Sequence, residues 1–391
     1  MKIIVFTSLF PNHENLDFGI FIKNRLFSFA QLEGCEIRVV APVPYSPPLR
    51  FLGKWYSYSK IAKKEIIEGM TVYHPRFPLI PKVSMQLHGF SMFFSTIRLI
   101  RKIQKEFPFD LIDAHYIYPD GFAGMLLGKI FRKPVVVTAR GSDINQFSKF
   151  MTIRPMIRKT LKNCQYVLSV CNALKDVMVD LGANPGKTRV IPNGIHIEKF
   201  YPENKNESRK LFSLHENKKI IFSVGSLIPR KGHHLVIDAM PELIDKMPDI
   251  HFFIAGEGEY RKTLEKKISE LRLKDHITLL GHIPNSDLRK WYSASDIFCL
   301  ASSREGWANV IMESMACGTP VVATNVWGAP EIITSQNLGL LVSRDIGSIT
   351  KGLEKALTKN WDRELIAEHV ATRTWEVVAK EVKDVFNTVL S

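Results

Sequence analysis

Short apolar runs alternate with helix-like stretches along the whole chain, and this alternation constrains the fold more than any other feature. Most of the runs are apolar on both faces, as expected for parallel strands that are covered by helices on both sides. The pattern therefore predicts an α/β protein with two doubly wound parallel sheets. The predicted strands of the first half are Lys2–Thr7, Glu36–Ala41, Phe109–His115, Pro134–Arg140, Gln165–Val170 and Thr188–Ile191. Those of the second half are Lys219–Val224, His251–Ala255, His276–Leu280, Asp296–Ala301, Pro320–Thr324 and Gly339–Val342.

A turn signal marks the predicted boundary between the two halves. It is the sequence Pro-Asn-Gly at 192–194, and the polar stretch Glu203–Arg209 follows it. A chain of 391 residues suits two domains rather than one core. We therefore expect domains at 1–195 and 196–375. Ligands of such sheets bind beyond the carboxyl ends of the strands, so we expect the two domains to face each other across a cleft that holds the chemistry.

Positive charge is concentrated in the first half. The net charge is +14, and all of this excess lies within residues 1–195. Residues 71–105 contain no acidic residue, and a basic amphipathic segment of this kind is typical of a membrane-surface contact. An ordinary helix with its apolar side in the core would show the same pattern, so both interpretations stay open. No known nucleic-acid-binding motif accompanies the charge, and we expect no nucleic-acid partner. The basic residues of this segment are Arg76, Lys82, Arg98, Arg101, Lys102 and Lys105.

Cysteine usage and hydropathy indicate the compartment. The five cysteines are odd in number and form no C-x-x-C pair, which favours a reducing environment. The apolar N-terminal run breaks at Pro11 and has no small-residue cleavage site, so it is interpreted as a first strand rather than a signal peptide. No apolar run is long enough to span a bilayer. We expect a cytoplasmic protein, with contact to the cytoplasmic face of the membrane as an open alternative.

The sequence SREGWANVIMESMACGTPVV, residues 303–322, holds two carboxylates at a fixed spacing. Glu305 lies in a loop after a predicted strand, and Glu313 lies on a helix that we expect from about Ala308 to Cys317. The free N–H groups at such a helix start bind anions. Carboxylates accept hydrogen bonds from the vicinal hydroxyls of sugars, so this pair could hold two sugar rings beside a diphosphate. Spacing alone also allows a helix-start carboxylate and a solvated one.

Further motifs occur in order along the chain. They are FGIF at Phe18–Phe21, DAHYIYPDG around His115, TARGSDIN at Thr138–Asn145, IPNGI at Ile191–Ile195, GSLIPRKG at Gly225–Gly232, AGEGEY at Ala255–Tyr260 and GAPEII at Gly328–Ile333. Together with E-x7-E and ACGTPVV, this ordered set resembles the family 4 retaining glycosyltransferases of the GT-B fold. The likeness extends over most of the chain and is greatest to bacterial enzymes of surface-polysaccharide synthesis, of the teichuronic-acid type.

The resemblance implies roles for individual residues. Glu305 would contact the donor sugar and Glu313 the ribose, and His115 would support the transition state. The family usually has an arginine where this chain has Ser226, so Lys231 is the firmer phosphate ligand and Arg230 the second cation. The polar groups of Arg140, Gly141, Ser142 and Asp143 are candidates for the acceptor side of the cleft. The remaining donor-site candidates are Gly19, Gly225, Ile283, Gly306, Trp307, Ala308, Asn309 and Val310.

The implied reaction is retaining transfer of a hexosyl or N-acetylhexosaminyl group from a nucleotide-diphosphate sugar to a saccharide or lipid-linked acceptor. UDP is favoured over GDP as the nucleotide. The second domain would bind the donor and the first the acceptor, and the last helix, within 376–391, would return to the first domain. The sequence has no D-x-D motif and no His/Cys cluster, so we expect no metal and no other cofactor. Two alternatives stay open: a UDP-sugar 2-epimerase of the same fold, and a non-catalytic subunit that binds sugar nucleotides.

Overall fold

The computed structural model describes residues 1–80 and 84–391, so Lys82 of the basic segment lies outside the described residues. The chain forms two compact units. Unit 1 consists of Met1–Gly194 and Trp375–Ser391, and unit 2 consists of Ile195–Thr374. The division predicted from the sequence, at 195/196, lies one residue later.

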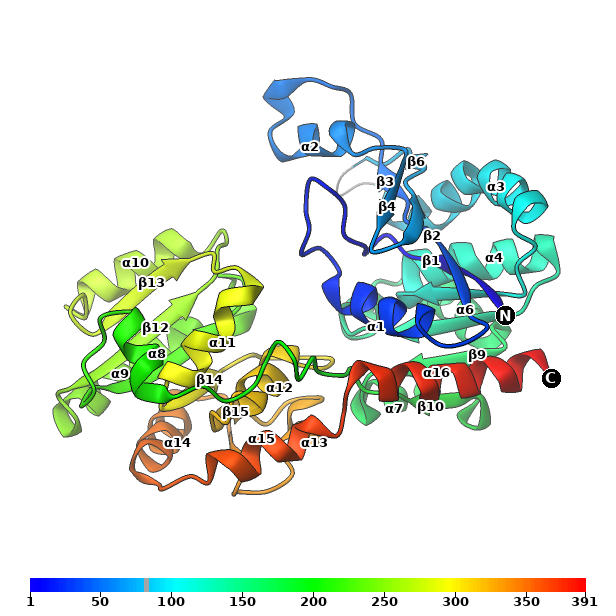
Figure 1. Ribbon diagram of the computed structural model, residues 1–391. Helices are drawn as coiled ribbons and strands as arrows, with labels where there is room; N and C mark the ends of the chain where they lie inside the picture. Colours follow the sequence, from blue (N-terminus) through cyan, green and yellow to red (C-terminus); the bar gives the residue numbers. More distant parts are fainter. Residues whose placement is uncertain (81–83) are drawn as a thin grey trace. The chain divides into compact units, whose positions relative to one another are not determined.

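Unit 1 is built on a sheet with the strand order β10-β9-β8-β7-β1-β2-β5-β4. Figure 1 labels β1, β2, β4, β9 and β10 of this sheet. The strands pair in parallel except for β4 and β5, which are antiparallel. Strand β1 is central, and the parallel strands that follow it in the chain extend the sheet outward on both sides, as a doubly wound fold requires. All six strands predicted for this half are present. The bounds are β1 Lys2–Phe6, β2 Glu36–Val40, β4 Lys64–Ile67, β5 Met70–Tyr73, β7 Leu111–His115, β8 Val135–Ala139, β9 Tyr166–Ser169 and β10 Thr188–Val190.

The β4–β5 hairpin was not predicted from the sequence. Its turn is formed by Glu68 and Gly69, which both have positive φ angles, of 46° and 80°. Strand β4 is an edge strand with charged residues and only half-buried or exposed side chains, so it lacks the apolar run by which the other strands were found. The two-residue strands β3 (Val43–Pro44) and β6 (Arg76–Phe77) were missed as well.

The last helix of the chain belongs to unit 1. Helix α16 (Trp375–Leu390) packs on α1 (Ile20–Ala30), where the rings of Phe29 and Phe386 meet edge to face with centroids 5.3 Å apart. Both helices contribute to the apolar core on one side of the sheet. The other helices of unit 1 are α2 Lys54–Lys60, α3 His88–Glu106, α4 Phe122–Phe131, α5 Ser142–Asn145, α6 Arg154–Asn163 and α7 Asn172–Asp180.

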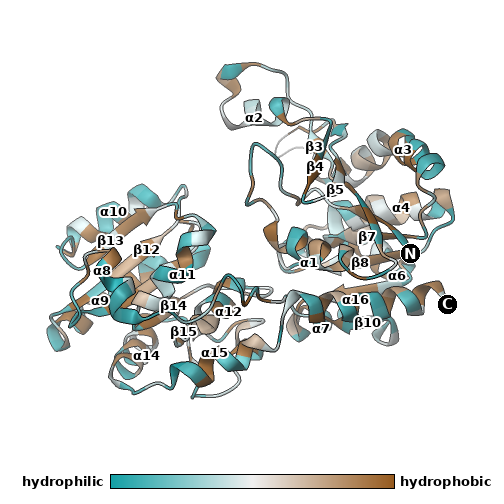
Figure 2. Ribbon diagram, in the orientation of Figure 1, coloured by the Kyte–Doolittle hydropathy of each residue, from teal (hydrophilic) through white to brown (hydrophobic). Residues whose placement is uncertain are grey.

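Unit 2 contains one parallel sheet in the order β13-β12-β11-β14-β15-β16. Separate apolar clusters line the two sheet faces, and Figure 2 shows hydrophobic strands beside hydrophilic helix surfaces such as that of α10. All six strands predicted for this half are present. Their bounds are β11 Lys219–Val224, β12 Ile250–Ala255, β13 Ile277–Gly281, β14 Ile297–Leu300, β15 Val321–Thr324 and β16 Gly339–Val342. The helices are α8 Lys205–Leu211, α9 His233–Lys246, α10 Arg261–Glu270, α11 Asn285–Ala294, α12 Asn309–Ala316, α13 Ala329–Ile332, α14 Ile346–Thr358 and α15 Arg363–Ala371.

The basic segment 71–105 ends in helix α3, which packs against the core of unit 1. One face of α3 is buried through Met92, Thr96, Ile100 and Ile103, while its basic side chains lie on the exposed side. This is the packing of an ordinary amphipathic helix, and the expectation of a membrane contact is not tested by it. Among the described helices, none has the length and apolar character needed to cross a bilayer.

Candidate functional site

The predicted donor residues of unit 2 gather at one point of its sheet. Strands β11 and β14 are neighbours, although they are the first and fourth strands of the unit, so the strand order reverses between them. The loop Gly225–Gly232 follows β11, and the loop Ser302–Trp307 follows β14. Both loops therefore leave the carboxyl ends of the strands at the topological switch point, which is where doubly wound sheets bind their ligands.

Glycine lets the two loops pack closely. Gly232 has φ +75°, and a Cβ atom added to it would lie 2.0 Å from the carbonyl oxygen of Ala301. The backbone N–H of Ser303 also donates to the carbonyl oxygen of Arg230 at 2.9 Å. The loop that carries Lys231 thus packs directly against the end of β14. This close contact requires glycine at position 232, because no larger residue fits there.

Glu305 is the centre of an ionic cluster formed by these loops. Lys231 Nζ donates to Glu305 Oε1 at 2.7 Å, and Ser302 Oγ donates to the same oxygen at 2.7 Å. Arg230 Nη1 lies 3.6 Å from Glu305 Oε1 and donates to the carbonyl oxygen of Arg304 at 2.9 Å. Two cations surround one carboxylate, so the cluster keeps one positive charge with which to meet an anion.

The Glu305 carboxyl is held in its charged form. Burial acts to raise its pKa, but Lys231, Ser302 and Arg230 outweigh that effect and place the pKa below the usual range. The carboxylate is therefore a hydrogen-bond acceptor at neutral pH, fixed in position by donors from both loops, as binding of sugar hydroxyls requires.

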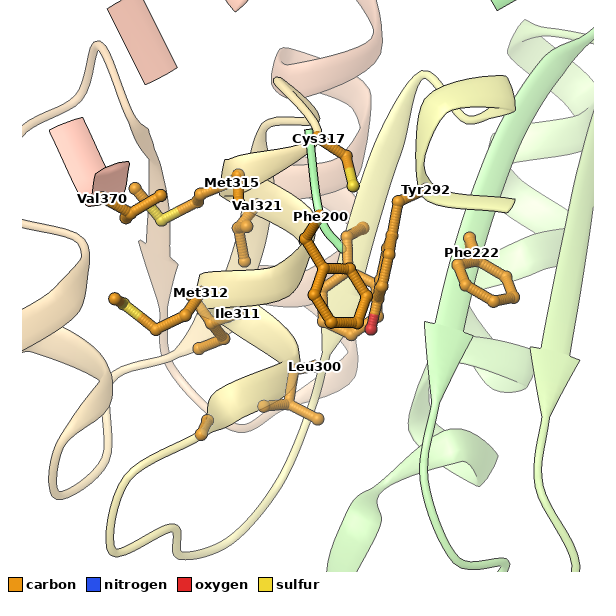
Figure 3. Close-up of a cluster of buried hydrophobic side chains, with 14 of the residues drawn as sticks. Phe200, Phe222, Tyr292, Leu300, Ile311, Met312, Met315, Cys317, Val321 and Val370 are labelled. Carbon is orange, nitrogen blue, oxygen red and sulfur yellow. The ribbon is translucent and has the colours of Figure 1, made fainter. Parts of the chain in front are cut away.

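Glu313 has the opposite environment. It lies on α12 next to the apolar cluster that contains Tyr292, Ile311 and Met312 (Figure 3), and Tyr292 Oη donates to Glu313 Oε2 at 3.1 Å. Burial raises the pKa of the Glu313 carboxyl to about 7. The pKa values of these two glutamates, eight positions apart, are thus shifted in opposite directions, because one faces cations and the other faces an apolar core.

Replacing Glu313 by Gln is expected to stabilise the ligand-free protein above neutral pH. The folded pKa of about 7 exceeds the usual value of 4.5, so the native carboxyl loses stability as the pH rises from 4.5 through 7. Gln imitates the protonated form, and we expect Glu313→Gln to gain about 1–3 kcal/mol over the parent at pH 8 and little at pH 5. Urea unfolding at both pH values measures this difference. Glu368→Gln, at an exposed position, is the control, and an equal gain in both variants would contradict the assignment.

The start of α12 has no side-chain cap and no acidic residue in its first turn. The contact of its N-terminal N–H groups with donor phosphates, predicted through Gly306–Val310, is thus not opposed by an acidic residue of the first turn. The indole Nε1 of Trp307 is buried and has no hydrogen-bond partner among the described residues. Ile283 packs at the edge of the apolar cluster that contains Tyr292. Their contacts with a nucleotide stay predictions.

In unit 1 the predicted residues His115 and Arg140 belong to a buried ionic cluster. Arg25 Nη2 donates to Asp113 Oδ2 at 2.9 Å, and His115 Nε2 lies 3.2 Å from the same oxygen. Arg140 Nη2 lies 2.7 Å from His115 Nδ1, and Arg140 Nη1 donates to Asn193 Oδ1 at 3.0 Å. The cluster joins the ends of β7 and β8 to helix α1.

The His115 side chain is fully buried, with no solvent-exposed area. Burial, opposed by Asp113 and reinforced by Arg140 and Arg25, lowers its pKa to about 3, so the imidazole is neutral. Nδ1 accepts from Arg140, which leaves the ring proton on Nε2 toward Asp113. The family resemblance implied a place for this histidine beside the donor sugar. The structure shows it between Arg140 and Asp113, and its contact with a ligand stays a prediction.

Several other candidates have local structural partners. The Asp143 carboxylate is buried and accepts from the backbone N–H groups of Ile117 and Gly141, both at 2.8 Å, and of Arg140 at 3.1 Å. Ser142 hydrogen-bonds the hydroxyl of Tyr116. Gly19 begins α1 with φ +70°, and a Cβ there would lie 2.4 Å from the carbonyl oxygen of Leu9. These positions shape the loops, and their contacts with ligands stay predictions.

Four residues of these clusters were not predicted from the sequence: Ser302, Tyr292, Asp113 and Arg25. Asp113 lies in an apolar strand, Arg25 and Tyr292 lie on helices, and Ser302 begins a loop; a single polar residue at such places is ordinarily solvated or structural. Asp113 and Ser302 did carry a signal, because a polar residue within or directly after a buried strand needs a partner.

Comparison with protein families covers both halves of the chain. Residues 28–199 match the family described as Glycosyltransferase Family 4, and residues 204–372 match the family Glycosyl transferases group 1. The chain belongs to the family 4 glycosyltransferases. The glycosyltransferase is thus a transferase enzyme of polysaccharide or glycolipid synthesis, as its curated relatives are.

One relative is similar over nearly the whole length. TuaC of Bacillus subtilis, provisionally assigned to teichuronic acid biosynthesis, is 27% identical over 97% of the glycosyltransferase and 94% of its own chain. The GPI3 subunit of phosphatidylinositol N-acetylglucosaminyltransferase from Saccharomyces cerevisiae is 25% identical over 85% of the glycosyltransferase and 74% of its own length. A GDP-mannose-dependent mannosyltransferase of Mycolicibacterium smegmatis is 26% identical over 64% of the glycosyltransferase and 68% of its own length.

Solved structures show the same fold at low identity. Sucrose-phosphate synthase from Thermosynechococcus elongatus superposes with a TM-score of 0.81 at 19% identity, covering 99% of the glycosyltransferase and 98% of that chain. Anabaena HepE in complex with UDP superposes with a TM-score of 0.74 at 18% identity, covering 99% of the glycosyltransferase and 100% of that chain. The predicted GT-B fold is confirmed.

Proposed function

We propose that this glycosyltransferase moves a sugar from a UDP-sugar to a saccharide or lipid-linked acceptor with retention of anomeric configuration and without a metal. The observation that carries the proposal is the Lys231–Glu305–Ser302 cluster at the switch point of unit 2. It combines an ionised carboxylate for sugar hydroxyls with cations for a diphosphate, at the place in the sheet where nucleotides bind.

The leaving group sets the main chemical demand. When the bond from the anomeric carbon to phosphate breaks, negative charge grows on the diphosphate and must be met by fixed positive groups. Arg230, Lys231 and the N-terminal end of α12 supply such groups from this chain. We propose that they stabilise the diphosphate while Glu305 orients the sugar and Glu313 binds the ribose.

In unit 1 we propose that His115 acts as a positioning residue through Arg140, while the unit binds the acceptor. The neutral imidazole accepts from the guanidinium, which also lies 5.4 Å from the centre of the Phe21 ring. Arg140 is thereby fixed as a half-buried cation, suited to an anionic group on a substrate.

The choice of nucleotide rests on the relatives. HepE is solved with UDP and with UDP-glucose, whereas the mycobacterial relative is GDP-mannose-dependent. A panel of UDP- and GDP-sugars with mass spectrometry of the products tests the donor. Turnover of a UDP-sugar and retained configuration in the NMR spectrum of the product, both unchanged by EDTA, are expected. An isomerised sugar formed without any acceptor would support the 2-epimerase instead, and binding without turnover would support a non-catalytic subunit.

We further propose peripheral contact of unit 1 with anionic membranes, because the whole charge excess of the chain lies within residues 1–195. In a flotation assay, the protein is expected to float with vesicles that contain an anionic lipid and to remain below with neutral ones. Binding should fall as salt is raised, because electrostatic attraction is screened. Equal flotation with both vesicle types would contradict this proposal.

A further inference from the structure

A separate cavity of about 520 Å³ lies wholly within unit 1. Its walls come from the segments that follow β1, β2 and β5, represented by Phe10, Pro42 and His74, together with helices α2 and α3. The cavity thus opens at the carboxyl ends of parallel strands, which is the ligand-binding edge of this sheet type. None of the residues with a proposed role in the reaction lines it.

The lining of this cavity is mainly aromatic and apolar. Helix α2 contributes Trp55 and Tyr58, whose ring centroids are 5.5 Å apart, and later segments of the chain contribute Phe77 and Met92. The nitrogens of His74, a polar lining residue, are already used by Ala41 and Glu65. A saccharide needs many directed hydrogen bonds, whereas this lining suits an apolar chain.

One buried nitrogen of a lining residue has no hydrogen-bond partner among the described residues. The Nε2 atom of His88, at the start of α3, is buried and makes no hydrogen bond with the described residues. Buried nitrogens are ordinarily paired, and His88 lines the cavity, so a polar group of the occupant can pair this nitrogen after a small shift of the surrounding side chains.

The surface around the cavity is mainly apolar and basic, although the lining also contains Glu14, whose carboxylate lies 3.8 Å from Lys60 Nζ. Residues 37–64 contain no acidic residue and six basic ones. Large apolar side chains are exposed in the same part of unit 1: Phe51 is 81% exposed and Leu49 is 44% exposed, both beside α2, and Ile80 is 62% exposed beyond Leu79 of the lining. This combination fits an occupant with an apolar chain and a negatively charged head group.

We propose that this cavity binds the apolar chain of a lipid-phosphate-linked acceptor where the chain joins its phosphate. The proposal rests on the proposed function and gives the acceptor a chemical class. Trp55 and Tyr58 contact the chain, His88 Nε2 bonds the phosphate or the polar group next to it, and the exposed apolar residues around α2 meet the lipid surface that supplies the acceptor.

Calorimetric titration with farnesyl phosphate tests the proposal, with farnesol and inorganic phosphate as the separate parts of the probe. The parent should bind farnesyl phosphate more tightly than farnesol and should not bind phosphate alone. The double variant Trp55→Ala/Tyr58→Ala should weaken binding of farnesyl phosphate and farnesol at least tenfold. His88→Leu, which keeps the side-chain volume, should weaken farnesyl phosphate severalfold and leave farnesol unchanged.

Phe150→Ala removes a 42% exposed aromatic outside the cavity and is the matched control, expected to bind like the parent. Hydrogen exchange across β7 and β8 checks that each variant keeps unit 1 folded. Binding of UDP depends on unit 2 in the proposed function and should be the same in the parent and in all variants. If the parent does not bind UDP, that result counts against the proposed donor site and not against this cavity. The proposal is overturned if the parent does not bind farnesyl phosphate. It is also overturned if the double variant binds farnesyl phosphate as tightly as the parent does, or if the double variant loses only its binding to vesicles.

Discussion

Lys231→Ala is expected to lower sugar-donor turnover at least about 100-fold, as removal of one fixed charge-stabilising donor does in other enzymes. The ammonium group is the cation nearest to Glu305, at 2.7 Å, and its loss removes both a diphosphate ligand and the partner that fixes this carboxylate. Glu305→Gln should cause a similar loss, because the amide has no negative charge to pair with Lys231 and one of its two heavy atoms no longer accepts hydrogen bonds. Turnover of the UDP-sugar and UDP affinity by calorimetry are the measurements.

The matched control is Lys246→Ala. Lys246 lies in the same unit and pairs with Glu242 and Glu354 on the surface, where ion pairs contribute little. It should keep the parent's turnover and UDP affinity. If Lys231→Ala retained more than half of the parent's turnover while staying folded, the assignment of the donor site to this cluster would fail.

Asp113→Asn is expected to destabilise unit 1 by about 3–5 kcal/mol, the usual effect of removing one partner of a buried ion pair. Asp113 is 1% exposed and Arg25 3%, and the guanidinium would be left buried without a carboxylate. Burial acts to raise the pKa of Asp113, but Arg25, His115 and Arg140 outweigh it and lower the pKa, so the native carboxylate is charged. Hydrogen exchange of the β7 and β8 peptides measures the effect within unit 1.

Glu106→Ala provides the comparison for Asp113→Asn. It breaks the pair between Arg38 and Glu106, 3.6 Å apart, where the Glu106 side chain is 52% exposed. We expect a change below about 1 kcal/mol. A replacement of both buried partners, Arg25→Met with Asp113→Leu, should recover part of the lost stability because it leaves no unpaired charge. If Asp113→Asn were as stable as Glu106→Ala, the buried cluster would not hold unit 1 together.

The sequence by itself determined the class of the fold and the positions of twelve strands along the chain. All twelve predicted strands are present, because strands buried on both faces leave a local apolar run that needs no knowledge of distant residues. The motifs that carry the family resemblance could be found for a similar reason, because the loops GSLIPRKG and SREGW each come just after such an apolar run. The hairpin of β4 and β5 was not predicted, because an edge strand with exposed side chains leaves no such apolar run in the sequence.

Only the tertiary structure decided the state of each site residue. Lys231 and Glu305 are 74 positions apart and meet because β11 and β14 are neighbours. Glu305 and Glu313 belong to one short motif, yet cations lower the pKa of the first and burial beside Tyr292 raises that of the second. His115 is a single histidine at a strand end in the sequence, and only the fold shows that it is buried between Asp113 and Arg140. Burial and charge partners are set by packing between segments remote in the chain, and local pattern carries no record of them.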